Sequence, residues 1–201
     1  MNKQAQPNHP IHELIANRWS PYCYAPRAVE PEKLTSCLEA ARWAASSYNE
    51  QPWTFILATR DDQPEFSKLL GCLVEANQVW AQHVGVLMLG VIAKAFSRNG
   101  TLNRVAMHDL GLAAGNLCLQ ATALGLSVHQ MGVGGVDLEK ARQVYAIPET
   151  HAPVTAIAIG YTADPDVSDP QLAGRDKGPR TRKPLSEFVY RGQWGTSAFG
   201  S

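Results

Sequence analysis

The sequence predicts a single domain of the α+β or α/β class, in which helices cover the faces of one sheet. Segments with strand-like and helix-like patterns alternate along the 201 residues, and no internal repeat or long linker divides them. Charged residues make up 18% of the chain, a composition that argues against disorder. The formal net charge is zero, so no global field is available to hold nucleic acid or an anionic membrane.

Helices are predicted wherever apolar residues recur at helical spacing. The clearest case opens with Pro31 and Glu32, which suit the first turn of a helix, and then places Leu34, Cys37 and Ala41 on one face. The predicted helices are residues 11–17, 31–45, 65–76, 103–124 and 138–145.

Four strands are predicted between these helices. Residues 84–93, VGVLMLGVIA, form a continuous apolar run that is typical of a strand buried on both faces. The remaining predicted strands are residues 53–59, 126–131 and 154–161. From residue 162 onward the periodic pattern ends, and the prolines there indicate turns.

The helix at residues 103–124 carries apolar side chains around most of its circumference, so it has no wide polar face to show to water. Gly111 and Gly115, one turn apart, would let another backbone approach closely. Such a helix is either central in its own domain or buried by self-association. We favour self-association, because unusually apolar surfaces are typical of obligate interfaces.

Cysteine and histidine spacings argue against a metal site. The four cysteines form no CxxC pair, and the six histidines form no HExxH motif, so buried reduced thiols are expected. No apolar run of 18 residues occurs, and the N-terminal residues lack the apolar core of a signal peptide. We therefore expect a cytoplasmic protein without a metal.

Two segments combine positive charge with hydroxyl groups. Arg18 and Ser20 stand two residues apart and could hold one phosphate or the edge of a polar ring. Five basic residues fall between positions 175 and 183, opposed only by Asp176. This run is either a solvated tail or a phosphate site, since guanidinium groups bind phosphate through two hydrogen bonds.

Two further segments are rich in neutral hydrogen-bonding groups or glycine. SSYNEQPWTF, residues 46–55, is either a polar turn or a surface that binds a polar, uncharged molecule. HQMGVGG, residues 129–135, follows a predicted strand, where glycines permit positive φ and close approach of the backbone to a ligand. The segment matches neither a dinucleotide-binding GxGxxG motif nor a P-loop.

Taken in order, these segments resemble the FMN-dependent nitroreductase family over nearly the whole chain. The matching pieces are R-x-S at Arg18 and Ser20, SSxNxQPW at residues 46–53, HQMGVGG at residues 129–135, and R-x-R-K-P-L-x-E-F at residues 180–188. The resemblance implies an α+β fold with a central mixed β-sheet flanked by helices, in an intertwined homodimer. It also implies one domain over residues 1–201, with residues 182–201 packing on the partner subunit.

By the same resemblance, FMN is the cofactor and NAD(P)H is a transient co-substrate. Arg18, Ser20, Arg180 and Arg182 hold the phosphate and ribityl end, and Asn77 contacts the pyrimidine edge. The residues expected to bind FMN are Arg18, Trp19, Ser20, Tyr22, Ser46, Ser47, Asn49, Gln51, Asn77, Gln130, Met131, Gly132, Val133, Gly134, Gly135, Arg180 and Arg182. No catalytic side chain is expected, because a flavin carries the hydride itself.

The implied activity is hydride transfer from NAD(P)H through the flavin to electron-poor acceptors, such as nitroaromatics or quinones, with ping-pong kinetics. A flavin-binding protein with little turnover, or an enone reductase or dehalogenase on the same scaffold, are the alternatives. Many relatives carry a cation at the position of Tyr22, and some carry a lysine at that of Trp80. The absence of both predicts a lower flavin potential, unless Arg104 or another cation reaches the same edge.

Overall fold

Four strands form one sheet in the computed structural model, which describes residues 3–199. The strands are β1 (Trp53–Thr59), β2 (Val86–Ala93), β3 (Ser127–Met131) and β4 (His151–Gly160), in the order β1-β2-β4-β3. All three neighbouring pairs are antiparallel. The α+β class is confirmed, but the expected mixed sheet is corrected to an antiparallel one over the described residues. Strand β2 starts at the end of the sheet where β1 finishes, as the pairing of Thr59 with Val86 shows.

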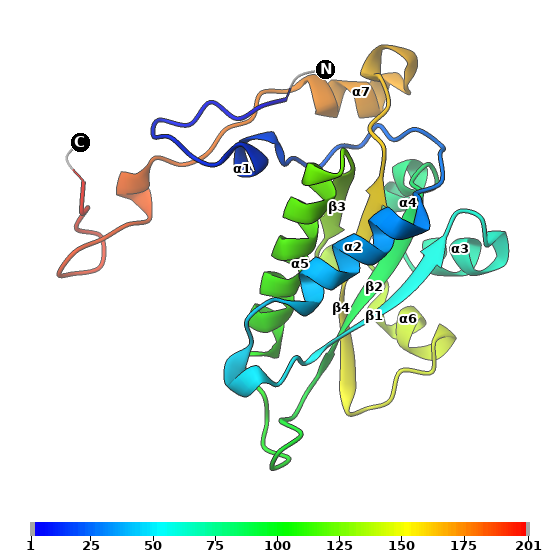
Figure 1. The fold of residues 1–201 in the computed structure, drawn as a ribbon, viewed down its shortest axis with the longest axis horizontal. Helices are drawn as coiled ribbons and strands as arrows, with labels where there is room; N and C mark the ends of the chain where they lie inside the picture. The colour runs from blue at the N-terminus through cyan, green and yellow to red at the C-terminus, as the bar shows by residue number, and fades with distance from the viewer. Residues whose placement is uncertain (1–2, 200–201) are drawn as a thin grey trace.

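Helices cover both faces of this sheet (Figure 1). Alternate residues of β2 point to two separate cores, which is why all of its residues except the last are buried. The helices are α1 (Glu13–Asn17), α2 (Pro31–Arg42), α3 (Gln63–Leu70), α4 (Glu75–Ala81), α5 (Ala106–Ala123), α6 (Leu138–Val144) and α7 (Pro170–Lys177). Leu87 and Leu89 pack in a core with residues of α3, α4 and α6, and Val86 and Met88 pack in a second core with residues of α2 and α5.

Two helix predictions differ from the structure. The single helix expected at residues 65–76 is wrong, because the chain breaks between α3 and α4, where Leu73 forms a β-bridge with Val136. Helix α7 lies in the stretch predicted to be irregular. It starts at Pro170 because the side chain of Asp169 accepts hydrogen bonds from the first free backbone N–H groups, and it buries Leu172.

Helix α5 is buried on one side only within a single chain. Its outer side carries Met107, which is 57% exposed, and Leu112, which is 40% exposed. A Cβ atom added at Gly111 or Gly115 would meet nothing within 4 Å. The expectation of burial around the whole circumference is therefore not met by one chain alone.

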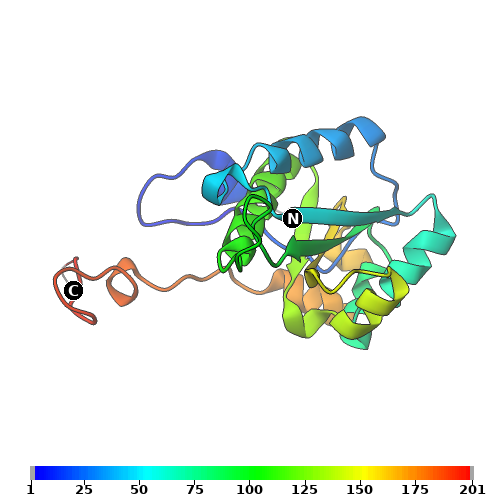
Figure 2. The same cartoon turned by 90° about the horizontal axis from the view of Figure 1, so that it is seen from below.

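The chain after α7 leaves the body of the molecule as an arm, residues 183–199, which includes a short 3-10 helix, η4 (Leu185–Glu187). Figure 2 shows this arm extending away from the layered core. Its aromatic side chains are largely uncovered, and Trp194 is 93% exposed.

Across residues 3–199, none of the helices combines the length and the apolar character that crossing a membrane would require.

Candidate functional site

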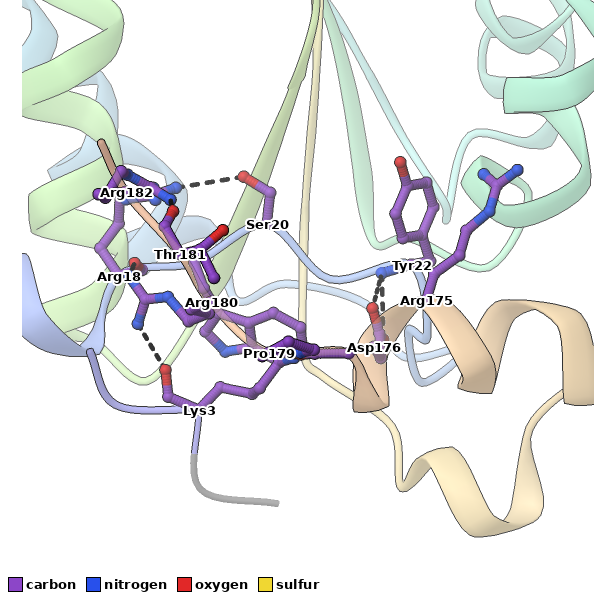
Figure 3. A pocket seen from close by; sticks show the side chains of 12 residues that line it. Lys3, Arg18, Ser20, Tyr22, Arg175, Asp176, Pro179, Arg180, Thr181 and Arg182 are labelled. Carbon is purple, nitrogen blue, oxygen red and sulfur yellow. Dashed lines mark hydrogen bonds between the residues drawn. The ribbon is translucent and has the colours of Figure 1, made fainter. Parts of the chain in front are cut away.

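A pocket of about 310 Å³ opens between the N-terminal segment and the chain around α7 (Figure 3). It joins parts of the sequence that are more than 150 residues apart. Five of its side chains are cationic and one is a carboxylate. The lining residues are Lys3, Arg18, Trp19, Ser20, Tyr22, Arg175, Asp176, Gly178, Pro179, Arg180, Thr181 and Arg182.

Arg18 and Arg182 lie on the same side of this pocket, beside Ser20. Arg18 Nη1 donates to Ser20 Oγ at 3.2 Å, and Arg182 Nη1 donates to the Thr181 carbonyl at 2.7 Å. A guanidinium carries five N–H donors, so both side chains keep donors for an anion in the pocket.

Arg180 has a different role in the fold. Its guanidinium donates to the backbone carbonyls of Lys3, Ala16 and Arg18, at 2.7 Å for Ala16 and 2.9 Å for Arg18. Burial, with the nearby charges of Arg18 and Arg182, lowers the pKa of Arg180. These bonds tie the N-terminal segment to the irregular segment that follows α7. Arg180 therefore builds the pocket wall that carries Arg18.

Asp176 fixes the floor of the pocket. Its side chain is 1% exposed, and it accepts the backbone N–H of Tyr22 at 2.9 Å and that of Cys23 at 2.8 Å. The neighbouring Arg175 places its guanidinium 4.8 Å from the centre of the Tyr22 ring, and Figure 3 shows these two side chains adjacent. A cation thus does reach Tyr22, but from α7.

An aromatic cluster connects Tyr22 to the sheet. The ring of His129, on β3, lies 4.8 Å from that of Tyr22 and stacks on Trp80 at 4.5 Å. The Nδ1 atom of His129 lies 2.8 Å from the carbonyl of Pro21. Burial lowers the pKa of His129, which favours a neutral ring whose Nδ1–H donates to that carbonyl.

Asn77 holds the segment that follows β3. Its Nδ2 donates to the Gly135 carbonyl at 3.1 Å, and its Oδ1 accepts from Trp80 Nε1 at 3.1 Å. A Cβ atom at Gly135 would lie 2.6 Å from Asn77 Nδ2, so any larger residue there would displace the Asn77 amide. None of the glycines at 132, 134 and 135 adopts a positive φ. The glycines therefore do not serve the turn conformation that the sequence suggested.

The SSxNxQ turn lies at the other end of α5, where Figure 1 shows η1 (Ser47–Asn49) far below α1 and α7. Three of its residues have left-handed backbone although none is glycine: Tyr48 at φ 54°, Asn49 at φ 55° and Gln51 at φ 51°. The backbone N–H of Ser47 donates to the buried Asp109 on α5 at 3.0 Å. Ser46 Oγ accepts the N–H of Gln51 at 3.0 Å.

The predicted FMN-binding residues thus fall into two groups. Arg18, Trp19, Ser20, Tyr22, Arg180 and Arg182 line the pocket, and Asn77 with residues 130–135 joins them through the aromatic cluster. Gln130 also contacts α5, where its Nε2 donates to Cys118 Sγ at 3.1 Å. Ser46, Ser47, Asn49 and Gln51 form the second group, at the far end of α5.

Some residues of the site escaped the sequence reasoning. Lys3, Asp176 and Asp109 carry no local motif, because each acts on a segment far from it in the sequence. Arg175 belonged to the noted basic run, but its place beside Tyr22 follows from α7, which the sequence reasoning did not predict.

Several known proteins are similar to this chain in sequence and in fold. The sequence profile of the Nitroreductase family matches residues 15–161. An uncharacterized 15.4 kDa protein of Mycolicibacterium smegmatis is 30% identical over 130 residues, which span 65% of this chain and 84% of that protein. A protein of Methanothermobacter thermautotrophicus, provisionally named an NADH dehydrogenase/NAD(P)H nitroreductase, is 28% identical over 156 residues, or 77% and 78% of the two chains.

Among solved structures, an oxidoreductase described as containing FMN superimposes with a TM-score of 0.88, with 28% identity and 98% of each chain covered. The family profile extends from α1 to the end of the sheet and so includes most of the structural core. The chain belongs to the nitroreductase family.

Proposed function

We propose that the protein is an FMN-dependent oxidoreductase that takes a hydride from NAD(P)H and delivers it to electron-poor acceptors such as nitroaromatics or quinones. The observation that carries the proposal is the cationic pocket around Arg18, Ser20 and Arg182, in a chain of this family. The similarity to an FMN-containing oxidoreductase over 98% of both chains supports the choice of cofactor.

The pocket fits the phosphate end of FMN. Lys3, Arg18 and Arg182 supply positive charge, and the hydroxyls of Ser20 and Thr181 supply neutral hydrogen bonds. A phosphate group is best bound by guanidinium N–H groups together with such neutral donors. The single carboxylate in the lining, Asp176, is already engaged with backbone N–H groups and faces away from this charge.

The uncharged part of the cofactor fits the remaining residues. The exposed backbone at residues 132–134, the Tyr22 hydroxyl and the Asn77 amide offer neutral hydrogen bonds next to the pocket. The side chains of the SSxNxQ turn match a ribityl chain and a pyrimidine edge in the same way. When bound, the flavin supplies the hydride chemistry itself, so these residues bind and orient it without acting as acids or bases.

We further propose a homodimer in which the pocket of one subunit and the SSxNxQ turn of its partner complete each FMN site. Two observations support it: the two groups of residues lie at opposite ends of α5, and the outer side of α5 exposes Met107, Leu112 and the open glycines. The arm with Trp194 then packs on the partner subunit, within a single domain of residues 1–201.

Because all four cysteines are free and buried, we place the protein in the reducing cytoplasm.

An absorbance spectrum and a turnover assay test the proposal. The purified protein should be yellow and should release FMN, not FAD, on denaturation. NADH or NADPH oxidation should then depend on an added nitroaromatic or quinone. Colourless protein that cannot be reconstituted with FMN would refute the cofactor. Yellow protein without acceptor-dependent oxidation would identify a flavin-binding protein with little turnover.

A further inference from the structure

Two carboxylates are buried among residues 3–199, and each holds the backbone of one segment assigned to the flavin. Asp176 is 1% exposed and binds the loop that carries Ser20 and Tyr22, whereas Asp109 is 2% exposed and binds the SSxNxQ turn. The two aspartates belong to different helices, α7 and α5, at opposite ends of the proposed site.

Both oxygens of Asp176 accept backbone N–H groups. Oδ1 accepts from Tyr22 at 2.9 Å, and Oδ2 accepts from Cys23 at 2.8 Å and from Tyr22 at 3.1 Å. Charge-assisted bonds of this kind are about twice as strong as neutral ones. They set the backbone direction directly after Ser20 and leave the side chains of Ser20 and Arg18 free to face the pocket.

Asp109 has a different arrangement, since only one of its oxygens accepts a backbone N–H. Oδ2 accepts from Ser47 at 3.0 Å, and Oδ1 lies 3.1 Å from the Nδ1 atom of His108. The turn it holds contains three non-glycine residues with left-handed backbone. Such residues are strained and persist only where the surroundings enforce them.

Stability alone is a poor reason to bury these charges. Burying an ionised carboxylate is costly, and among the described residues neither aspartate forms an ion pair with a lysine or arginine. Asp176 accepts the backbone N–H groups of Tyr22 and Cys23, and Asp109 accepts that of Ser47, in the segments assigned to the flavin. The carboxylates thus order the main chain while the side chains of those segments stay available to a ligand.

We propose that Asp109 and Asp176 are positioning residues, which preorganise the ring-side turn and the phosphate-side loop before the cofactor binds. The inference rests on the proposed FMN function. It predicts that replacement by Asn has different effects at the two positions, because their hydrogen-bond partners differ. Asn at position 109 can present its oxygen to Ser47 N–H and its NH₂ to His108 Nδ1, whereas Asn at position 176 must turn an NH₂ group toward a backbone N–H.

The test measures the Kd of FMN and of riboflavin, which lacks the phosphate, for the full-length wild type and four variants. Asp109→Asn should keep the FMN Kd within about threefold of wild type, and Asp109→Ala should raise it about ten- to a hundredfold for both ligands. Asp176→Asn should raise the Kd of FMN far more than that of riboflavin. Asp62→Ala is the control, because Asp62 caps α3 with a similar backbone bond away from both segments.

Thermal unfolding of each apoprotein separates positioning from general stability. The proposal is overturned if FMN affinity falls only in proportion to the loss of unfolding temperature and Asp62→Ala follows the same proportion. It is equally overturned if Asn is tolerated at both positions or at neither. If Asp176→Asn does not fold, Asp176→Glu replaces it and the FMN-to-riboflavin ratio decides. A wild type that binds no FMN would instead refute the proposed function, before any variant is compared.

Discussion

The two ends of α5 present flavin-assigned residues in different ways. At its C-terminal end, the pocket is assembled from the N-terminal segment and the chain around α7 and is rich in guanidinium groups. One of these, on Arg180, donates to three carbonyls. At its N-terminal end, a single turn of neutral residues is held in left-handed backbone conformations by Asp109 and Ser46. The pocket depends on contacts between distant segments, whereas the turn combines bonds within residues 46–51 with one distant bond to Asp109.

On the proposed assignment, the residues of one FMN site come from two chains. The pocket lining includes none of the turn residues, and α5 separates the two groups. An 18-residue helix is about 27 Å long at a rise of about 1.5 Å per residue. The predictions below follow from this separation, beginning with the largest expected effect.

Mixed dimers offer the strongest test. Arg18→Glu places a negative charge in the pocket, and Asn49→Val places a β-branched residue at φ 55°, so dimers of either variant should retain little FMN. If each site uses the pocket of one subunit and the turn of the other, co-expressed mixed dimers isolated by two tags contain one intact site. They should hold about one FMN per dimer.

Equilibrium dialysis of the isolated mixed dimers gives this ratio directly. Both parental dimers, prepared with the same tags, serve as controls. A mixed dimer that binds no more FMN than its parents would mean that each site lies within one chain.

Removal of the arm should disrupt the assembly itself. Truncation after Arg182 deletes the aromatic residues of the arm, including Phe188 and Trp194, which are largely exposed in the single chain. If they cover the partner, the truncated chain should be monomeric or aggregated, because the apolar outer side of α5 is then left open. Light scattering at micromolar concentration measures this, and a stable truncated dimer would assign the arm another role.

Substitution of single arginines should separate binding from pocket construction. Arg18→Ala and Arg182→Ala each remove charge-assisted donors worth about 1.5 to 3 kcal/mol, which corresponds to about ten- to a hundredfold weaker FMN binding. Arg180→Ala should instead lower the unfolding temperature of the apoprotein, because three backbone carbonyls lose their donor. Fluorescence titration measures the FMN affinity, and calorimetry measures the unfolding temperature. Equal losses of stability in all three variants would contradict the division of roles.

The smallest effect concerns the flavin potential. The sequence placed no cation at the positions of Tyr22 and Trp80, but the structure stacks Arg175 on the Tyr22 ring at 4.8 Å. Arg175→Ala should therefore lower the two-electron midpoint potential by tens of millivolts, where about 30 mV corresponds to about 1.4 kcal/mol. Tyr22→Arg should raise it. Spectroelectrochemistry measures both potentials. An unchanged potential in both variants would mean that Tyr22 and Arg175 do not lie next to the flavin ring.

Local features of the chain were predictable from its sequence. The strand expected at residues 53–59 matches β1. The apolar run at residues 84–93 contains β2, because continuous apolarity reports burial on both faces of a sheet. Each of the four motifs is a short contiguous run, so its residue types could suggest a phosphate and a polar, uncharged partner without knowledge of the fold.

Tertiary structure alone decided the remaining features. The break between α3 and α4 follows from the pairing of Leu73 with Val136, and the antiparallel sheet follows from where each connection returns the chain. Asp109 and Asp176 act on backbone groups 62 and 154 residues away along the chain. Periodicity and turn chemistry extend over a few residues only. A buried carboxylate that meets a distant N–H therefore leaves no pattern in the sequence, and its role becomes visible only when the fold brings the two groups together.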